Sequence, residues 1–353
     1  MKKVIAVFSS LILTASLLAG CGASSAPAAT TAPTPTTAPA APAAVETQAL
    51  ETQAPAAASY KVAIVQQLDH SSLDEIRTAV AAELQSKADA AGIELTISEF
   101  NGQNDPTMLG QIGAQVMGDS VDMIIPIATL AAQTMVTAAE GTNTPIVYAA
   151  ISDPESAGLT GLDKVTGTSD ALNTPFILDM MLAANPDVKT VGLLYSNSEA
   201  NSTMPIAEAK AYLDSKGISY LEKTGNTTDE IVTAASSLVG RVDAVFTPTD
   251  NAVMAAEVAV AEILNEAGIP HYTGADSFVQ AGGFTTCGIN YTELGTYTAD
   301  MAFDILTGGA VPEFHVMDGG IITVNTDTAK ALGIDYSVFN TMANTVVEVT
   351  TAE

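Results

Sequence analysis

The stretch Val242–Asn251, VDAVFTPTDN, decides the fold. A Val-Asp pair opens a short apolar run, which Pro and small polar residues close before a helix-like segment. An apolar run of this length between turn signals predicts a buried strand of a parallel sheet. The stretch Val121–Thr129, VDMIIPIAT, has the same design.

The similarity continues on both sides of these two stretches. Lys61–Ser72 resembles Thr190–Asn201, because each is a strand pattern that runs into a polar loop. Thr144–Gly158 resembles Ile269–Gly283 in the same way. Three similar segments in one order and at nearly one spacing predict two lobes of the same architecture, and 353 residues are enough for both.

From Tyr60 on, strand patterns alternate with helix patterns, which predicts α/β lobes with doubly wound parallel sheets and right-handed crossovers. We expect one lobe to contain residues 60–167 and 290–319, and the other to contain 168–289 and 320–353. The chain would cross between them at Val165–Gly167, Thr286–Ile289 and Ile321–Val324, forming a multi-strand hinge. The other predicted strands are 61–65, 93–99, 123–127, 145–149, 191–195, 219–223, 244–248 and 271–273, and the predicted helices include 73–91, 104–117, 131–140, 205–216, 229–239, 252–267 and 291–306.

The N-terminus has the features of a secretory signal. Residues 1–21 begin with Lys2 and Lys3, continue through an apolar run and end in Leu-Ala-Gly-Cys. The run is too short to span a membrane and is typical of a signal peptide. Its ending resembles the bacterial lipobox, so we expect Cys21 to be lipidated and to anchor the protein at the outer side of the bacterial cell membrane.

Residues 22–59 are mostly Ala, Pro and Thr, which predicts a disordered tether.

The composition and the absence of certain motifs argue against several classes of function. The chain has 12 Lys and Arg against 40 Asp and Glu, a formal net charge of −28, so we expect no nucleic-acid partner. Its three histidines are far apart in the sequence, and no nucleophile elbow or phosphate-binding loop occurs. We therefore expect no metal, no cofactor and no enzyme activity.

Several segments resemble the substrate-binding proteins of ABC importers with the type I periplasmic-binding-protein fold, in the family of the tryptophan/tyrosine type. The resemblance implies that the protein captures a small solute, often an aromatic amino acid, and delivers it to an ABC permease. We expect it to act as a monomer and to close its hinge on the ligand. The segments that carry it are IVQQLDHSSLD (Ile64–Asp74), VDMIIPIATLAAQ (Val121–Gln133), YAAISDPESAGL (Tyr148–Leu159), LLYSNSEANS (Leu193–Ser202), PTDNAV (Pro248–Val253) and INYTELG (Ile289–Gly295).

A free amino acid needs a partner for its carboxylate. Helix N-termini bind carboxylates through backbone N–H groups and the helix dipole. Thr129 and the segment Ser198–Ser202 lie just before predicted helices, so they are candidates for this contact; plain N-capping is the alternative. Within that segment the candidate residues are Ser198, Glu199, Asn201 and Ser202.

The ammonium group needs a carboxylate in the cleft. Asp250, Asp153 and Asp276 all follow predicted strands on the cleft side, although Asp is also common in loops and caps. Asp250 is the first choice among them. Further polar candidates are Thr249, Asn251 and Gln133.

The first strand and the strand ends supply the remaining candidates. Asp69, His70 and Ser71 lie at the mouth of the first strand, where His70 is expected to form a pocket wall or donate a hydrogen bond. Tyr148 ends a strand near the cleft and is a candidate for stacking on an aromatic ligand, as are Tyr195 and Phe246. Aromatic residues in strands are more often part of the core.

Two alternatives remain open at this point. A ligand sensor with the same two lobes would present its closed form to a membrane receptor instead of a permease. The ligand itself could be a branched-chain amino acid or a nucleoside. Under all of these alternatives the mechanism is the same, a hinge equilibrium that the ligand shifts by contacting both lobes.

Overall fold

The computed structural model describes residues 58–352. The predicted signal segment, Cys21 and residues 22–57 of the predicted tether lie outside the described residues. The first strand, β1, begins at Ser59, although composition places this residue in the tether. Ser59 belongs to the strand because it pairs with Glu94 of β2. None of the described helices is long and apolar enough to cross a membrane.

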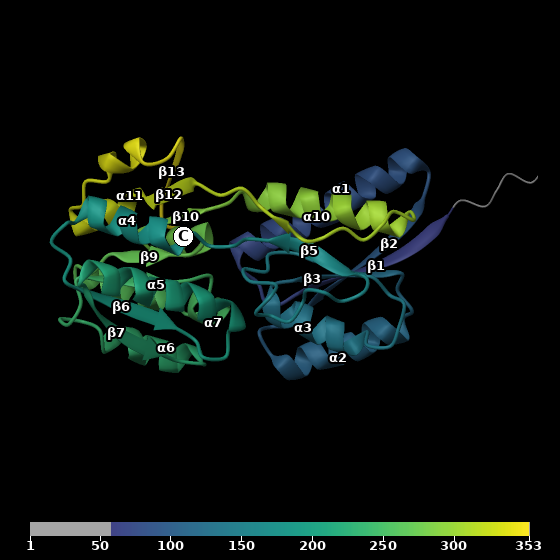
Figure 1. The fold of residues 1–353 in the computed structure, drawn as a ribbon, viewed down its shortest axis with the longest axis horizontal. Helices are drawn as coiled ribbons and strands as arrows, with labels where there is room; N and C mark the ends of the chain where they lie inside the picture. The colour runs from purple at the N-terminus through teal and green to yellow at the C-terminus, as the bar shows by residue number, and fades with distance from the viewer. Residues whose placement is uncertain (1–57, 353) are drawn as a thin grey trace, which may run out of the picture. The chain divides into compact units, whose positions relative to one another are not determined.

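Six strands form the first sheet, in the order β11-β5-β4-β3-β1-β2, and all neighbours are parallel. Together with their helices they are called the first lobe (Figure 1). The strands are β1 (Ser59–Gln66), β2 (Glu94–Asn101), β3 (Met123–Ile127), β4 (Ile146–Tyr148), β5 (Val165–Ser169) and β11 (His315–Val316), and the helices are α1 (Ser71–Ala91), α2 (Pro106–Gly118), α3 (Thr129–Ala138) and α10 (Tyr291–Leu306).

The buried middle of β1, Val62–Val65, is apolar because helices cover both faces of the sheet. Val62 and Ile64 of β1 pack in one buried cluster with α1 and α10. The residues between and after them, Ala63 and Val65, pack in another cluster with α2 and α3. Side chains alternate between the two faces of a strand, so both sets must be apolar. The same alternation runs through β3.

Seven strands form the second sheet, in the order β13-β12-β10-β9-β8-β6-β7. With its helices it makes the second lobe (Figure 1). The strands are β6 (Thr190–Tyr195), β7 (Ser219–Thr224), β8 (Ala244–Thr247), β9 (His271–Thr273), β10 (Thr285–Gly288), β12 (Ile321–Asn325) and β13 (Thr345–Val349), the helices are α4 (Thr174–Ala184), α5 (Thr203–Lys216), α6 (Thr228–Ser236), α7 (Asn251–Met254), α8 (Glu257–Glu266), α9 (Asp276–Gln280) and α11 (Thr326–Leu332), and the 3₁₀ segments are η1 (Ala200–Ser202) and η2 (Ser337–Thr341).

The internal repeat predicted from the sequence is confirmed by the strand orders. The first sheet contains the series β2-β1-β3-β4-β5, and the second contains β7-β6-β8-β9-β10. The two stretches that decide the fold supply β3 and β8, each of which lies beside the first strand of its lobe. Both lobes are α/β units with mostly parallel sheets, as predicted.

Three details differ from the prediction. Val165–Gly167, expected as a crossing between lobes, lies inside the first sheet because β5 pairs with β4. Thr286–Ile289 and Ile321–Val324, the other two expected crossings, lie mostly in β10 and entirely in β12 of the second sheet, so the chain crosses in loops next to these strands. The sheets are also not entirely parallel, since β10 and β12 are antiparallel.

The helix predicted at 252–267 is divided into α7 and α8. The division places Glu257 at the start of α8, where its side chain is fully buried. Its Oε1 lies 2.9 Å from Nδ1 of His271, and Nε2 of His271 lies 2.7 Å from the Thr247 hydroxyl. This buried polar group joins α8 to β8 and β9, and a single straight helix pattern gives no sign of it.

Candidate functional site

A cavity lies where the carboxyl ends of the parallel strands in the two lobes face each other. The empty space there, counted together with the open solvent at its mouth, is about 390 Å³. The first lobe lines it through the residues that follow β1, β3, β4 and β5, and the second lobe through those that follow β6, β8 and β9. Open α/β sheets place ligands at this end of their strands, because the loops and helix N-termini there present polar groups.

Short polar residues and small side chains form the wall on the first lobe. Thr129 begins α3 and is buried at the cavity. Ala128 before it has a φ of 75°, and Ala150 after β4 has a φ of 56°. Left-handed backbone is uncommon for residues other than glycine and collects at ligand sites. These two residues turn the chain just after β3 and β4, where it meets the cavity.

Asp170, which follows β5, is the centre of a buried polar group. Ser152 donates a hydrogen bond to its Oδ1 at 3.0 Å. Tyr291, the first residue of α10, lies next to the same carboxyl group. The Ser152 hydroxyl also lies 2.9 Å from the hydroxyl of Thr249 in the second lobe. Burial raises the pKa of the Asp170 carboxyl, so a positive charge beside it would be favoured.

Asp250, the first choice for an ammonium partner, is fully buried and caps α7. Its Oδ2 accepts hydrogen bonds from the Ser196 N–H and the Ser202 hydroxyl, both at 2.7 Å. Its Oδ1 accepts from the Val253 N–H at 2.9 Å. All three donors belong to the second lobe. The carboxylate therefore has its own partners before any ligand arrives.

Glu199 bridges the two lobes. Its Oε1 accepts a hydrogen bond from Gln67 of the first lobe at 3.1 Å, and its Oε2 accepts one from Asn251 at 3.0 Å. Burial, with the nearby charge of Asp250 as the second cause, raises the pKa of Glu199 to about 7. A further cross-lobe bond joins the Ser72 hydroxyl to Asp276 at 2.9 Å. In this structure the lobes are thus closed on the cavity.

Three polar atoms at the cavity are buried and have no partner among the described residues. They are Nδ1 of His70, Oδ1 of Asn201 and Oγ of Ser277. The Asn201 and Ser277 side chains are 5% and 1% exposed, so water reaches them poorly. Buried polar atoms in folded proteins nearly always have a hydrogen-bond partner. Three orphaned atoms around one cavity indicate that a polar ligand supplies the missing partners.

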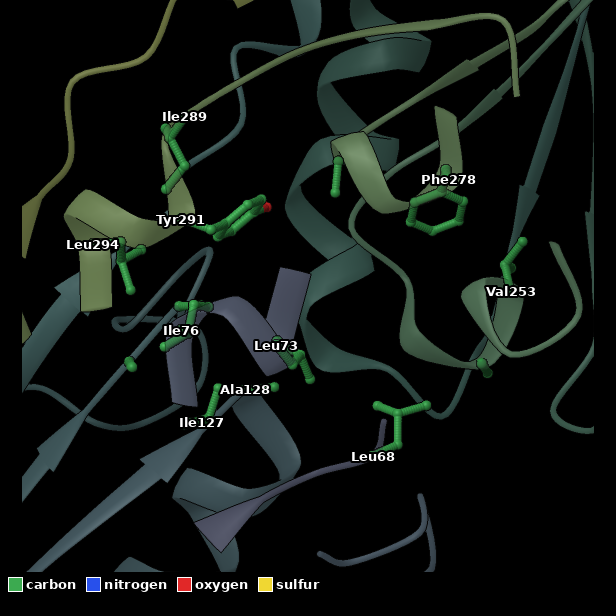
Figure 2. Close-up of a cluster of buried hydrophobic side chains, with 14 of the residues drawn as sticks. Leu68, Leu73, Ile76, Ile127, Ala128, Val253, Phe278, Ile289, Tyr291 and Leu294 are labelled. Carbon is green, nitrogen blue, oxygen red and sulfur yellow. The ribbon is translucent and has the colours of Figure 1, made fainter. Parts of the chain in front are cut away.

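Apolar side chains supply the rest of the wall. Figure 2 shows the rings of Tyr291 and Phe278 at one end, with Leu73 and Ala128 of the first lobe nearby. Phe278 and Tyr291 are almost completely buried. Apolar rings and aliphatic side chains thus form one part of the wall, and polar atoms from both lobes form the other.

The structure brings six of the candidate site residues to the cavity wall: His70, Thr129, Asn201, Thr249, Asp250 and Asn251. Glu199, Ser202 and Asp276 lie behind that wall in the hydrogen bonds given above. Asp69, Ser71 and Ser198 are exposed, and none of them lines the cavity. Gln133, Tyr148 and Asp153 do not line it either.

These last three side chains have other partners in the first lobe. Gln133 donates to the Ala157 carbonyl, and Asp153 accepts from the Ser156 N–H within its own loop. Tyr148 is fully buried in a small core cluster with Ile151. Tyr195 bonds Glu222, and Phe246 packs in the core of the second lobe. Among residues 58–352 no group of three or more His, Cys, Asp or Glu side chains could hold a metal ion.

The wall residues that the sequence patterns missed include Ser152, Asp170, Ser277, Phe278 and Tyr291. Ser152 and Tyr291 lie inside segments that carry the family resemblance, so their position was available as a signal. Ser277 and Phe278 lie in the repeated segment Ile269–Gly283. Asp170 follows β5, which the sequence predicts to be a crossing between the lobes. No sequence pattern therefore marks Asp170 as a residue of the site.

Comparisons with known proteins agree with this geometry. The family model described as "ABC transporter substrate binding protein" matches residues 61–344. A curated protein named "Tyrosine-binding protein" from Clostridioides difficile (strain R20291) is 32% identical over 278 residues, which cover 77% of this chain and 80% of that protein.

Two solved structures are especially informative. A domain from Streptococcus pneumonia in complex with L-Trp has 28% identity and a TM-score of 0.76, covering 82% of this chain and 100% of its own. The ligand-free, open structure of a substrate-binding protein with adhesive properties from Clostridium difficile has 32% identity and a TM-score of 0.63, covering 83% and 100%. The TM-score is higher for the complex with L-Trp than for the ligand-free, open structure, although the complex is less similar in sequence. This difference agrees with the closed arrangement of the two lobes in this protein.

Proposed function

Because this chain belongs to the family of ABC transporter substrate-binding proteins, we propose that it captures a free aromatic amino acid between its two lobes. The observation that carries this proposal is the cavity itself, where aromatic rings and orphaned polar atoms meet. The family consists of binding proteins, so the proposed activity is non-enzymatic and needs no cofactor. One molecule carries both halves of the cleft and would act as a monomer.

The charges at the cavity support an amino acid. Its only charged lining residues among those described are Asp170 and Asp250, with no Lys or Arg. A ligand ammonium would offset this negative charge. We assign the ammonium to Asp170, because the oxygens of Asp250 are already occupied within its own lobe. The ligand carboxylate would bind at Thr129, where the N-terminus of α3 favours an anion.

The aromatic class is supported by the walls and by the relatives. Phe278 and Tyr291 give two rings against which a ligand ring can pack. The relative named as a tyrosine-binding protein and the structure in complex with L-Trp are both similar to this chain over most of its length. A branched-chain amino acid has no ring to pack against Phe278 and Tyr291, and a nucleoside would bring no ammonium to Asp170.

Calorimetry with the purified protein tests the ligand class. We expect tyrosine, tryptophan or phenylalanine to bind with a dissociation constant in the micromolar range or below, on the order of −8 kcal/mol. Leucine, adenosine and glucose are the matched comparisons, and we expect them to bind at least about tenfold more weakly. Tight binding of leucine or adenosine with no response to the three aromatic amino acids would refute the aromatic assignment.

We further propose that the protein works outside the cytoplasm, anchored by a lipid on Cys21, and delivers its ligand to an ABC permease. The support is the lipobox-like ending of residues 1–21 and the family membership. A tether of Ala, Pro and Thr would let the lobes reach the permease while the anchor keeps them nearby.

Replacing Cys21 by Ser tests the anchor and the transport role together. We expect Cys21→Ser protein to be released into the medium or periplasm with unchanged ligand affinity. Cellular uptake of the labelled ligand should fall, because the local concentration at the permease is lost. Full uptake by this variant would contradict the need for the anchor. Cells that bind but never take up the ligand would indicate a sensor instead of an importer.

A further inference from the structure

A row of hydrogen bonds crosses the cleft twice and ends at the cavity. It begins at Gln67 in the first lobe, whose Oε1 accepts from the Leu130 N–H at 3.0 Å. The amide is thereby oriented, so its Nε2 is free to donate to Asn104 and to Oε1 of Glu199. A donor therefore faces Glu199 from the first lobe whatever the charge of that carboxyl group.

Glu199 in turn fixes the orientation of the Asn251 side-chain amide. Oε2 of the ionised Glu199 carboxylate accepts a hydrogen bond, and Nδ2 of Asn251 donates it at 3.0 Å. The other end of the Asn251 amide, Oδ1, then lies 3.4 Å from Nε2 of His70 in the first lobe. An amide oxygen only accepts hydrogen bonds, so the proton of the imidazole is on Nε2.

His70 itself is neutral. Burial lowers its pKa to about 4, so at neutral pH the ring carries one proton. With that proton on Nε2, Nδ1 is a hydrogen-bond acceptor. Nδ1 is buried and has no partner among the described residues, and His70 lines the cavity.

We propose that Glu199, acting through Asn251, is a positioning residue that holds His70 in the Nε2–H tautomer, so that Nδ1 accepts a hydrogen bond from a ligand N–H or O–H group. This rests on the proposed function for the existence of a ligand in the cavity. The tautomer can be measured with any solute that closes the lobes.

These hydrogen bonds determine how Glu199→Gln changes the protonation of His70. Gln67 still presents Nε2, so the oxygen of the new amide must face Gln67 and its NH₂ must face Asn251. Asn251 then turns its Oδ1 toward residue 199 and its Nδ2 toward His70. Nε2 of His70 has to accept, and the proton moves to Nδ1. The substitution therefore inverts the tautomer without removing a bond.

Protonation of Glu199 has the same effect, because the proton can sit only on the oxygen that faces Asn251. Asp250 is the charged group that faces Glu199, and it contributes after burial to a pKa of about 7. Asp69 and Asp74 lie near His70. Well above pH 7, Glu199 is charged and His70 keeps the Nε2–H tautomer, whereas below pH 7 the proton on His70 shifts to Nδ1.

Nitrogen-15 NMR of histidine-labelled protein measures the tautomer directly, and the chain has only three histidines. The wild type, saturated with a solute that stabilises it, should show an unprotonated Nδ1 on His70 at pH 8.5. Glu199→Gln should show a protonated Nδ1 at the same pH. Asp276→Asn is the matched control, since Asp276 also joins the lobes but bonds Ser72; it should keep the wild-type tautomer.

Substitutions of His70 test the ligand contact. The amide of His70→Asn lies near the position of Nδ1, whereas the amide of His70→Gln lies near that of Nε2. We expect Gln to bond Asn251 yet lose about tenfold or more in ligand affinity, and Asn to lose less. A loss for tyrosine and tryptophan but not phenylalanine assigns the donor to the ligand side chain; a loss for all three assigns it to the ammonium.

Two results would overturn the proposal: a protonated Nδ1 on His70 in the wild type at pH 8.5, or the same tautomer in Glu199→Gln as in the wild type. Equal affinity of His70→Gln and wild type for every ligand would remove the ligand contact. A failure of all aromatic amino acids to bind, with another solute closing the lobes, would refute the proposed function and leave the tautomer result valid.

Discussion

Replacing Ser152 and Thr249 by cysteine should join the two lobes by a disulfide and stop ligand exchange. The two hydroxyls lie 2.9 Å apart, and one comes from each lobe. A disulfide needs sulfur atoms about 2.05 Å apart on neighbouring backbones, so a small adjustment of the closed form allows it. In an open form the two residues would separate. Oxidation would therefore trap only the closed state.

The expected effect is large because release of the ligand requires opening. We expect ligand bound before oxidation to stay bound, with a dissociation rate at least about a thousandfold slower than that of the reduced protein. Ligand added after oxidation should fail to bind. Stopped-flow fluorescence gives the rates, and the change in gel mobility on reduction reports the crosslink.

The controls separate the crosslink from the loss of the hydroxyls. Ser152→Cys and Thr249→Cys are tested singly, because Ser152 also donates to Asp170. Cys21 is replaced by Ser in all variants, and Cys287 is buried and does not compete. Fast ligand exchange in the fully oxidised double variant would show that the lobes need not separate, and the hinge mechanism would be wrong.

The fold could be predicted from sequence to the extent that its strands are apolar runs with turn signals at both ends. Met123–Ile127 and His271–Thr273 have the bounds predicted for them. Both strands are fully buried. A strand that is buried on both faces has a pattern that can be recognised in a single sequence. The antiparallel pair of β10 and β12 could not be predicted, because antiparallel pairing depends on where a distant segment returns.

Part of the site could be predicted for a topological reason. The loops after β1, β3, β6 and β8 converge because the strands are parallel. This places His70, Thr129 and Asn251 at the cavity. The pattern of a single strand does not predict whether a given side chain points into the cavity or into the core. Tyr148 ends its strand as expected, yet its position points it into the core of the first lobe.

The partners of a carboxylate are equally hidden. Asp250 follows a buried strand, as a ligand-binding carboxylate would, but it accepts bonds from Ser196, Ser202 and Val253. Two of these donors come from a loop about 50 positions earlier in the chain, as the sequence separations of 54 and 48 show. Only the folded structure brings them together. The same holds for Asp170, whose partners Ser152 and Tyr291 lie on either side of it in the sequence.

Asp170→Asn should weaken binding of an aromatic amino acid by about 10- to 100-fold, and Asp250→Asn should mainly lower the melting temperature. Hydrogen bonds to charged groups contribute about 1.5–3 kcal/mol, which corresponds to this loss when the ammonium faces a neutral amide. Asn at position 170 can still accept from the Ser152 hydroxyl. Burial raises the pKa of Asp170, so the folded state already disfavours its charge and should not lose stability with Asn.

Asp250 differs because its oxygens accept from two backbone N–H groups and a hydroxyl. An Asn there must turn its NH₂ toward at least one of these donors. This leaves a buried N–H unpaired at a cost of about 1–3 kcal/mol. Calorimetry gives the affinity and thermal unfolding gives the stability of both variants. A large loss of affinity in Asp250→Asn with unchanged binding in Asp170→Asn would move the ammonium to the second lobe, because the charge that the ligand needs would then be the one that already caps α7.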